Sequence, residues 1–407
     1  MKTLSALLRV QNDLQLAVDS HGRAILVLLD LSAAFHTIDN DKLLNLLDVS
    51  FGIRGDSLKW FRSYLHNRTQ SVKIGKSYSD SHTLKFGVPQ GSVLGPILFT
   101  IYTTPLGKII RKHGLTYHLY ADDTQLYLAF KPSSDSSKHD ATTRIEKCVE
   151  EIKTWMTNNL LKLNEDKTEL IIVTTNYSIK EKQNIISLNI GGHTIDPSDD
   201  HPKNLGVIFD STCSLSQHVA NTCKTINFNL YSIGKVRKYL DQNTTEMMVN
   251  SLITSRMDFC NSLMYGMNKS LVTRLQRCQN NAARIVTLRR KYDHIQAYMC
   301  DLHWLPIEYR IQYKILLLTY KARHPDQLAP VYLKELLEEC PPPRSPRAEK
   351  SHLLKIPKYR LETFGGRSFA VAAPSLWNTL PRHLRLEPDV DKFKKGLKRH
   401  LFVKAYF

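Results

Sequence analysis

The hydrophobic and polar positions of the first two hundred residues switch repeatedly between strand-like and helix-like periods. Residues 24–32 form a continuous apolar run bounded by charge, typical of a strand covered on both faces. Residues 114–130 give two strand-like runs around an Asp-Asp-Thr step, which predicts a hairpin, and residues 167–175 predict a further strand. Helical periods occupy 39–52, 55–67 and 141–160, and residues 87–106 begin as a Gly/Pro loop before an apolar helix. This alternation indicates an α/β or α+β class around one sheet.

The pattern changes after about Ser211. Long helical stretches follow at 214–240 and 269–290, with few strand signals, which predicts a second, helical domain. Residues 339–347 are rich in proline and charge and are typical of a linker.

Charge adds a candidate partner. The formal net charge is +18 and the sequence pI is about 9.5, which favours a polyanionic partner. Residues 341–407 hold 15 Lys and Arg against 5 Asp and Glu, a net of +10. Two interpretations of this segment stay open: a solvated charged tail, or a contact with nucleic acid.

The seven cysteines are scattered and form no C-x-x-C pair, which predicts reduced, mostly buried thiols and no structural zinc site. No apolar run near the start is long enough for a membrane span or a signal peptide. We therefore expect an intracellular protein, in the nucleus or the cytoplasm, that is not secreted.

The candidate chemistry is carried by three aspartates. Asp122 and Asp123 stand side by side within strand-like sequence, and Asp30 ends a strand of six apolar residues. A polar turn at Asp122 and Asp123, and a helix cap at Asp30, are the alternatives. If the two strands are neighbours, the carboxylates converge and need a counter-charge, which Mg²⁺ supplies while bridging to substrate phosphates.

Several segments occur in the order found in reverse transcriptases: LLDLSAAF (28–35), GVPQGSVLGPILF (87–99), YADD (120–123) and LKLNEDKTEL (161–170). The chain most closely resembles the enzymes of LINE-type (non-LTR, Jockey-like) retrotransposons. NLGVIF (204–209), LQRCQNNAARIV (275–286) and GGRSFAVAAPSLWNTLP (365–381) extend the resemblance over essentially the whole chain.

The resemblance implies an α+β fold and an RNA-directed DNA polymerase. A palm with an antiparallel sheet and packed helices is expected at 24–210, a helical thumb and connection at 211–338, and a basic C-terminal module at 339–407. RNA template, DNA primer and deoxynucleoside triphosphates are the implied partners, with no membrane. Two Mg²⁺ ions, or Mn²⁺ in their place, are the implied cofactors.

The resemblance also assigns roles by position. Asp30 and Asp122 hold the metals with support from Asp123, and Leu31 adds its backbone carbonyl. Phe35 matches the aromatic steric gate that excludes a ribose 2′-hydroxyl. Gln90 and Gly91 match the loop against the incoming nucleotide, and Lys167 matches a lysine that protonates or steadies the pyrophosphate.

Arg274 and Arg277 share a helix face and could follow a phosphate backbone, and residues 204–209 resemble the primer-grip hairpin. Each assignment has a plainer alternative: Phe35 as a core residue, Gln90 and Gly91 as a turn, and the basic residues as solvated surface.

Two departures from the family stand out. Only 29 residues precede Asp30, so residues 1–23 are expected to be a remnant of the fingers, and the chain is expected to lack the N-terminal endonuclease domain of such elements. His36 follows the gate aromatic where the family has Asp. A truncated, inactive fragment that acts as a basic nucleic-acid-binding protein is therefore the competing hypothesis.

Overall fold

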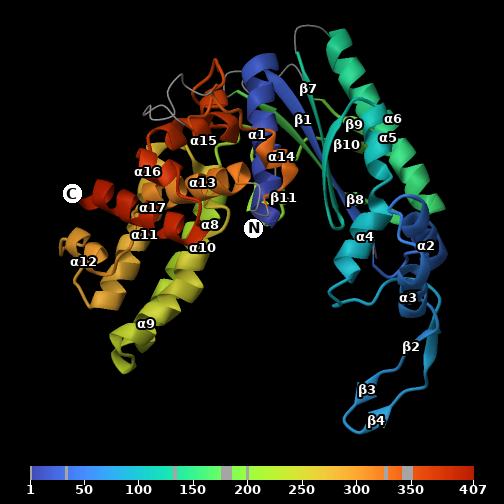
Figure 1. Ribbon diagram of the computed structural model, residues 1–407, viewed down its shortest axis with the longest axis horizontal. Coiled ribbons are helices and arrows are strands. Elements are labelled where there is room, and N and C mark those ends of the chain that lie inside the picture. Colours follow the sequence, from blue (N-terminus) through green and yellow to red (C-terminus); the bar gives the residue numbers. More distant parts are fainter. Residues whose placement is uncertain are drawn as a thin grey trace. The chain divides into compact units, whose positions relative to one another are not determined.

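The computed structural model describes residues 2–32, 35–131, 135–175, 186–198, 201–324, 329–341 and 352–407. The chain divides into two compact units. We call one the sheet unit, with Arg23–Ile172 and Tyr177–Asp199, and the other the helical unit, with Met1–Gly22, Val173–Asn176 and Asp200–Phe407. Figure 1 labels their elements.

The sheet unit is built on a four-stranded sheet in the order β6-β7-β1-β8. These strands are β6 (Thr116–Tyr120), β7 (Asp123–Phe130), β1 (Arg23–Ser32) and β8 (Lys162–Thr174). β7 pairs antiparallel with both β6 and β1. The first seven residues of β1 are all buried, which confirms the expected strand covered on both faces.

Helices form in the sheet unit where the sequence predicts them at α2 (Asn40–Val49), α3 (Gly55–Leu65), α4 (Gly95–Thr103) and α6 (Asp135–Asn158). A further helix that was not predicted, α5 (Leu106–Lys112), follows α4. Short hairpins complete the unit: β2 (Arg68–Gln70) with β5 (His82–Leu84), β3 (Lys73–Ile74) with β4 (Ser77–Tyr78), and β9 (Leu188–Ile190) with β10 (His193–Ile195). One core joins β1, β7 and these helices through buried aliphatic side chains. The α+β class and the palm-like arrangement are confirmed.

The helical unit contains one small hairpin, β11 (Lys203–Asn204) with β12 (Val207–Ile208), and many helices. The α-helices are α1 (Lys2–His21), α8 (Ser216–Val236), α9 (Gln242–Val249), α10 (Ser255–Asp258), α11 (Lys269–Thr287), α12 (Gln296–Asp301), α13 (Ile307–Arg323), α14 (Val331–Lys334), α15 (Phe369–Asn378), α16 (Arg382–Arg385) and α17 (Val390–Tyr406). The short turns are η1 (Arg237–Tyr239), the π-helical η2 (Asn250–Thr254), η3 (Asn261–Met264) and η4 (Gly365–Arg367). The predicted helical character after about Ser211 is confirmed, and the bounds of a thumb at 211–338 stay a prediction.

The C-terminal segment packs differently from the sequence-based expectation of a basic module behind a linker. Trp377 of α15 and Phe393 of α17 share one core with Leu316 and Tyr320 of α13. Residues 352–407 therefore pack into the helical unit through such buried side chains and are not a solvated tail. Most of the expected linker lies outside the described residues.

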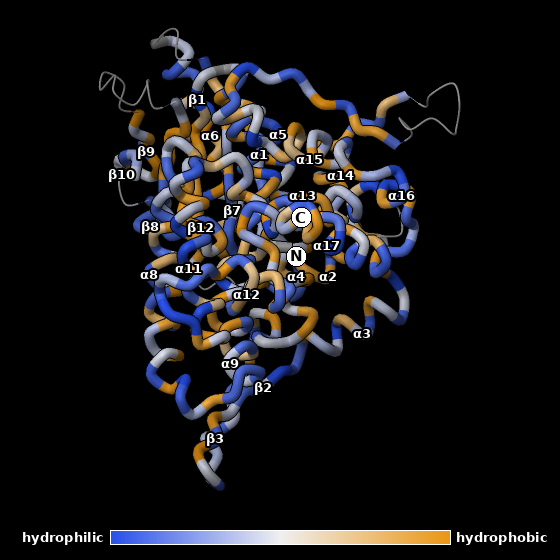
Figure 2. Tube along the Cα trace, turned by 90° about the vertical axis from the view of Figure 1, so that its left-hand side faces the viewer, coloured by the Kyte–Doolittle hydropathy of each residue, from blue (hydrophilic) through white to orange (hydrophobic). Residues whose placement is uncertain are grey.

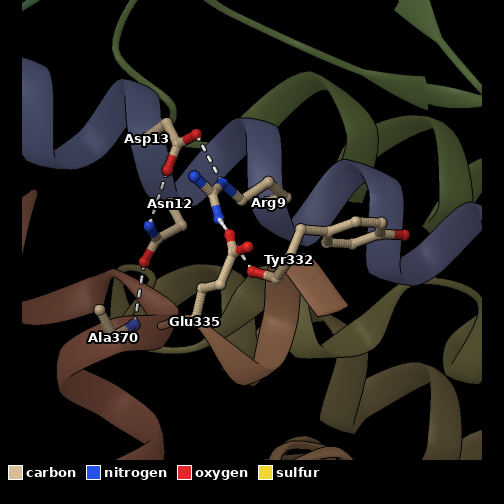
Figure 3. A network of polar contacts seen from close by, with 6 residues as sticks. All are labelled: Arg9, Asn12, Asp13, Tyr332, Glu335 and Ala370. Atoms are coloured by element: carbon tan, nitrogen blue, oxygen red, sulfur yellow. Dashed lines mark hydrogen bonds and ion pairs between the residues drawn. The ribbon is translucent and has the colours of Figure 1, made fainter. Parts of the chain in front are cut away.

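The N-terminal helix α1 groups with the helical unit, although residues 1–23 were expected to be a remnant of the fingers. Figure 3 shows the polar network that fastens it. Arg9 pairs with Asp13 at 2.8 Å and donates to the carbonyl of Tyr332 at 2.8 Å, and Asn12 Oδ1 accepts the backbone N–H of Ala370 at 2.9 Å. The bonds to Tyr332 and Ala370 join residues more than three hundred positions apart in sequence. The relation of residues 1–23 to a fingers region stays a prediction.

All seven cysteines are free and five of them are buried, as predicted from their spacing. Across the residues that the structure describes, none of the helices combines the length and the apolar character required to cross a membrane.

Candidate active site

The three candidate aspartates come from adjoining ends of two paired strands. Leu29 of β1 pairs with Thr124 of β7, so the next step of the register sets Asp30 opposite Asp123. β6 and β7 are joined by a tight turn in which Tyr120 pairs with Asp123 and Ala121 has a φ of 52°. Asp122 lies in this turn, as the hairpin prediction required.

The three carboxylates are close enough to interact electrostatically. Burial, with the negative charges of Asp122 and Asp30, raises the pKa of Asp123 to about 6. Asp30 has a local counter-charge, because Lys167 Nζ of β8 lies 3.4 Å from its Oδ2. The helix cap proposed as an alternative for Asp30 is supplied at α2 by Asp39, which accepts from the backbone N–H groups of Asp41 and Lys42.

The carboxylates do not form a preformed metal-binding site among the described residues. Among the described residues, no group of three or more His, Cys, Asp or Glu side chains is arranged to hold a metal ion. The donor chemistry still fits Mg²⁺ or Mn²⁺, because hard carboxylate oxygens accumulate negative charge here and Asp123 is destabilised in its ionised form. Assignment of Asp30, Asp122 and Asp123 as ligands remains a prediction.

Phe35 lies beside the loop that precedes α4. Its carbonyl accepts the backbone N–H of Val88 at 3.0 Å, and its half-buried ring lies 4.9 Å from the ring of Phe99. The ring therefore contributes to the core, which is the plainer alternative, and its role as a gate stays a prediction. The side chain of His36 is exposed.

The candidate nucleotide loop is shaped by its glycines. Gly91 has a φ of 78° with open space around it, and the side chain of Gln90 is exposed. Ser92 Oγ donates to the carbonyl of Pro89 at 2.7 Å and accepts the N–H of Gly95 at 3.0 Å, which sets the start of α4. No contact tests the roles assigned to Gln90, Gly91 or the buried Leu31.

Two residues that fix this loop were missed by the sequence analysis. Gly87 has a φ of 83°, and a Cβ there would lie 2.8 Å from the carbonyl of His36 and 2.9 Å from that of Phe35. Arg68 donates to the carbonyls of Phe86, at 3.1 Å, and of Gly87, and its partial burial lowers the pKa of its guanidinium. Glycine directly before the VPQG segment was an available signal for Gly87, whereas Arg68 carried none.

In the helical unit, the expected primer-grip segment does form a hairpin. β11 and β12 are joined through Leu205 (φ 47°) and Gly206 (φ 85°), the two-residue turn that favours a tight hairpin. Asp210 then orders the approach to α8 by accepting hydrogen bonds from the backbone N–H groups of Thr212, Ser214 and Leu215. The hairpin is confirmed, and its contact with a primer stays a prediction.

Arg274 and Arg277 of α11 are both exposed, but they face different neighbours. Arg274 lies near Cys223 of α8, where a hydrogen bond with Cys278 and, to a smaller extent, the charge of Arg274 lower the pKa of that thiol. Arg277 lines a cavity of about 440 Å³ together with Pro306 and Tyr309. Their binding to nucleic acid is untested.

Known proteins resemble this chain over its first half and beyond. The family model described as reverse transcriptase (RNA-dependent DNA polymerase) matches residues 3–209, just over half of the chain. Three relatives come from Drosophila melanogaster. The probable RNA-directed DNA polymerase from transposon BS is 25% identical over 64% of this chain, and that from transposon X-element is 24% identical over 70%. The RNA-directed DNA polymerase from mobile element jockey is 25% identical over 39%.

These matches take up only part of each relative: 28%, 30% and 17% of their lengths, respectively. Among solved structures, telomerase from Candida albicans in complex with a fragment of telomeric RNA has 12% identity and a TM-score of 0.35, over 77% of this chain and 50% of that one. The telomerase of Candida tropicalis has 12% identity and a TM-score of 0.37, over 74% and 52%.

The resemblance to LINE-type, Jockey-like enzymes is confirmed by the three insect relatives. Because the family model spans residues 3–209, with YADD and the other palm motifs inside it, the chain belongs to the reverse transcriptase family.

Proposed function

We propose that this chain is an RNA-directed DNA polymerase of a non-LTR retrotransposon, which extends a DNA primer along an RNA template by nucleotidyl transfer. The observation that carries the proposal is the pairing of Leu29 with Thr124, which brings the next residues, Asp30 and Asp123, to adjoining strand ends, with Asp122 in the turn beside them. Carboxylates collected at strand ends suit an enzyme that handles phosphates through divalent cations.

Asp30, Asp122 and Asp123 would hold two Mg²⁺ ions, or Mn²⁺, with the backbone carbonyl of Leu31. Bound there, the ions would supply activation of the primer 3′-hydroxyl and stabilisation of the leaving pyrophosphate. Mutual repulsion among the carboxylates, which contributes to the raised pKa of Asp123, is the charge that such cations would neutralise.

The chain's own side chains would position the reactants. Lys167, whose side chain is 70% exposed beside Asp30, would donate a proton or a hydrogen bond to the pyrophosphate. Gln90 and Gly91 would lie against the incoming deoxynucleotide, and the ring of Phe35 would exclude a ribose 2′-hydroxyl.

Basic groups of the helical unit would hold the nucleic acid. Arg274 and Arg277 are exposed on α11, and Lys395 and Arg399 are exposed on the face of α17 opposite its buried residues. Contacts of this kind with phosphates make binding strongly dependent on salt.

Primer extension on an RNA template with Mg²⁺ and deoxynucleotides tests the proposal. The Asp122→Ala, Asp123→Ala double variant should lose about a thousand-fold in rate, because the lost metal contacts stabilise the transition state by about 4 kcal/mol. The matched control removes the exposed Asp56 and Asp140, at 98% and 69% side-chain exposure, and should retain activity. Equal rates for the active-site variant and the wild type would refute the site.

A second function, nucleic-acid binding without polymerisation, is favoured by one observation. The described residues hold no preformed cluster of three metal-binding side chains. Wild-type protein that binds RNA in a salt-sensitive way, yet extends no primer with Mg²⁺ or Mn²⁺, would support this alternative.

A further inference from the structure

One face of α8 and of the turn η1 that follows it carries both lysine and aromatic side chains. Successive members are three or four residues apart, apart from the last two, which are adjacent. At 3.6 residues per turn the four members within α8 fall within one sector of the helix, about 60° wide, and the last two follow on the 3-10 turn η1. We call this set the α8 stripe: Lys224, Phe228, Tyr231, Lys235, Lys238 and Tyr239. Figure 2 shows hydrophilic and hydrophobic positions mixed along this helix.

The aromatic members are presented outward. Phe228 is 69% exposed, Tyr231 is 64% exposed and Tyr239 is 76% exposed. The opposite face of α8 packs into the core, where Ile226 and Ile233 are buried. Exposed aromatic rings that gather on one face and are not packed in the core indicate a surface that binds another molecule.

The cations of the stripe sit over its rings. Lys235 Nζ lies 4.5 Å from the centroid of Tyr231, and Lys238 Nζ lies 4.7 Å from that of Tyr239. Residues 214–240 contain four Lys and Arg and no Asp or Glu, so no acidic side chain from this segment offsets the positive potential. Arg237, the fourth cation, is buried and donates to the carbonyls of Ile285 and Val286.

The chemistry of the stripe selects among possible partners. A membrane surface would need a continuous free apolar face, but the apolar face of α8 is buried in the protein. An acidic protein would satisfy the lysines and leave the rings unused. Unpaired bases and their phosphates satisfy both, because bases stack on aromatic rings while lysines follow the backbone.

We propose that the α8 stripe binds single-stranded RNA, with Phe228, Tyr231 and Tyr239 stacking on unpaired bases and the lysines contacting the phosphates between them. The proposal deepens the proposed function, on which it rests for the choice of RNA as the partner. From Lys224 to Tyr239 the stripe runs about 22 Å along the helix, room for several nucleotides.

Fluorescence anisotropy of the full chain with a 12-nucleotide oligo(A) RNA, across a salt series, tests the proposal. In the Phe228→Ala, Tyr231→Ala, Tyr239→Ala variant, affinity should fall at least tenfold while the salt slope stays unchanged, because the rings contact no phosphate. In the Lys224→Gln, Lys235→Gln, Lys238→Gln variant, the slope of log affinity against log salt should shrink by about 2, near 0.7 for each lost phosphate contact.

The matched control removes one Phe and two Tyr that are exposed but scattered: Tyr292, Tyr359 and Phe407. It should bind as the wild type does. Replacing the three rings of the stripe with Leu keeps apolar bulk without a stacking surface and should weaken binding similarly, and thermal melting checks that each variant folds.

Three results would overturn the proposal that the α8 stripe binds single-stranded RNA. These are failure of the wild type to bind oligo(A), equal affinity of the control and stripe variants, and a loss of affinity by the stripe variants that is as large for an RNA duplex as for the single strand. Primer extension on a pre-annealed template separates these results from failure of the proposed function. Extension that depends on Asp122 and Asp123, in a protein whose stripe variants bind normally, would leave the polymerase intact and remove only the inference.

Discussion

The sheet unit and the helical unit are assembled from the chain in different ways. Apart from its short second segment, the sheet unit comes from one continuous block, Arg23–Ile172, although its strand β1 pairs with the much later β7. The helical unit joins the first 22 residues to the last two hundred, through bonds such as that of Asn12 with Ala370. Sequence patterns are local, so they describe the first kind of assembly better than the second.

The two units also differ in the chemistry that they display. The sheet unit gathers carboxylates at the ends of β1 and β7, where negative charge is costly without a cation. The helical unit displays lysines and rings along α8, where the matching ligand is an anion with flat groups. On our proposals, one unit would bind metal and phosphate, and the other would bind bases and the nucleic-acid backbone.

Of the substitutions that test this comparison, the largest loss of stability should come from one in the core of the helical unit. Trp377 is fully buried, its Nε1 donates to the carbonyl of His352 at 3.0 Å, and its ring lies 6.0 Å from that of Phe393. Trp377→Ala should lower the free energy of unfolding by about 3–5 kcal/mol, because it leaves a large cavity and an unpaired carbonyl. Urea unfolding followed by hydrogen exchange would measure the loss.

The exposed Trp60, at 51% exposure, provides the control, since Trp60→Ala should change stability by only about 0.5 kcal/mol. Protection should be lost first in residues 305–401. An equally mild effect of both substitutions would mean that the C-terminal segment does not share a core with α13.

The next effect belongs to the sheet unit and concerns the loop beside Phe35. Gly87→Ala should cost about 3 kcal/mol, combining the strain of a positive φ with a clash against two backbone carbonyls. Gly91→Ala carries the same kind of φ but meets no atom within 4 Å, so it should cost only about 1–2 kcal/mol.

Chemical denaturation of both glycine variants checks this order, and primer extension adds a second readout. Only Gly87→Ala should displace the backbone of Phe35 and weaken the discrimination against ribonucleotides. Equal stability losses would show that φ alone accounts for both.

The elements of the sheet unit were predictable because their signals are short-range. An apolar run bounded by charge predicted β1, and the step at Asp122 and Asp123 predicted the β6–β7 hairpin. The candidate aspartates followed from the ends of those strands. Arg68 could not be predicted, because its role depends on carbonyls of residues 86 and 87 brought near by the fold.

In the helical unit, helices were predicted but their partners were not. Nothing within residues 2–21 indicates that α1 would bond to residues 332, 360, 361 and 370. The linker-like composition of 339–347 suggested a separate module after it, so the core that Trp377 and Phe393 share with α13 was not predicted. The α8 stripe was visible in the spacing of its lysines and rings, but exposure decides whether such a stripe is surface or core.

The smallest of these effects tests how firmly the two ends of the chain are joined. Asp19 of α1 is buried, and its carboxylate accepts the backbone N–H of Leu361 at 2.6 Å and of Arg360 at 3.0 Å. Asp19→Ala should cost about 2 kcal/mol, because charged hydrogen bonds are lost and buried donors are left without partners. Asp19→Asn keeps one acceptor oxygen and should cost less, whereas Ser20→Ala, at an exposed neighbour, should cost almost nothing.

Hydrogen exchange at Arg360 and Leu361 distinguishes a local from a global loss. If α1 is an integral part of the helical unit, Asp19→Ala should speed exchange at these amides and in α15, while β1 and β7 keep their protection. Unchanged exchange at residues 360 and 361 would mean that α1 only rests on that unit. The two units would then differ only in the side chains that they display, because the long-range bonds of the N-terminus would no longer distinguish how the helical unit is assembled.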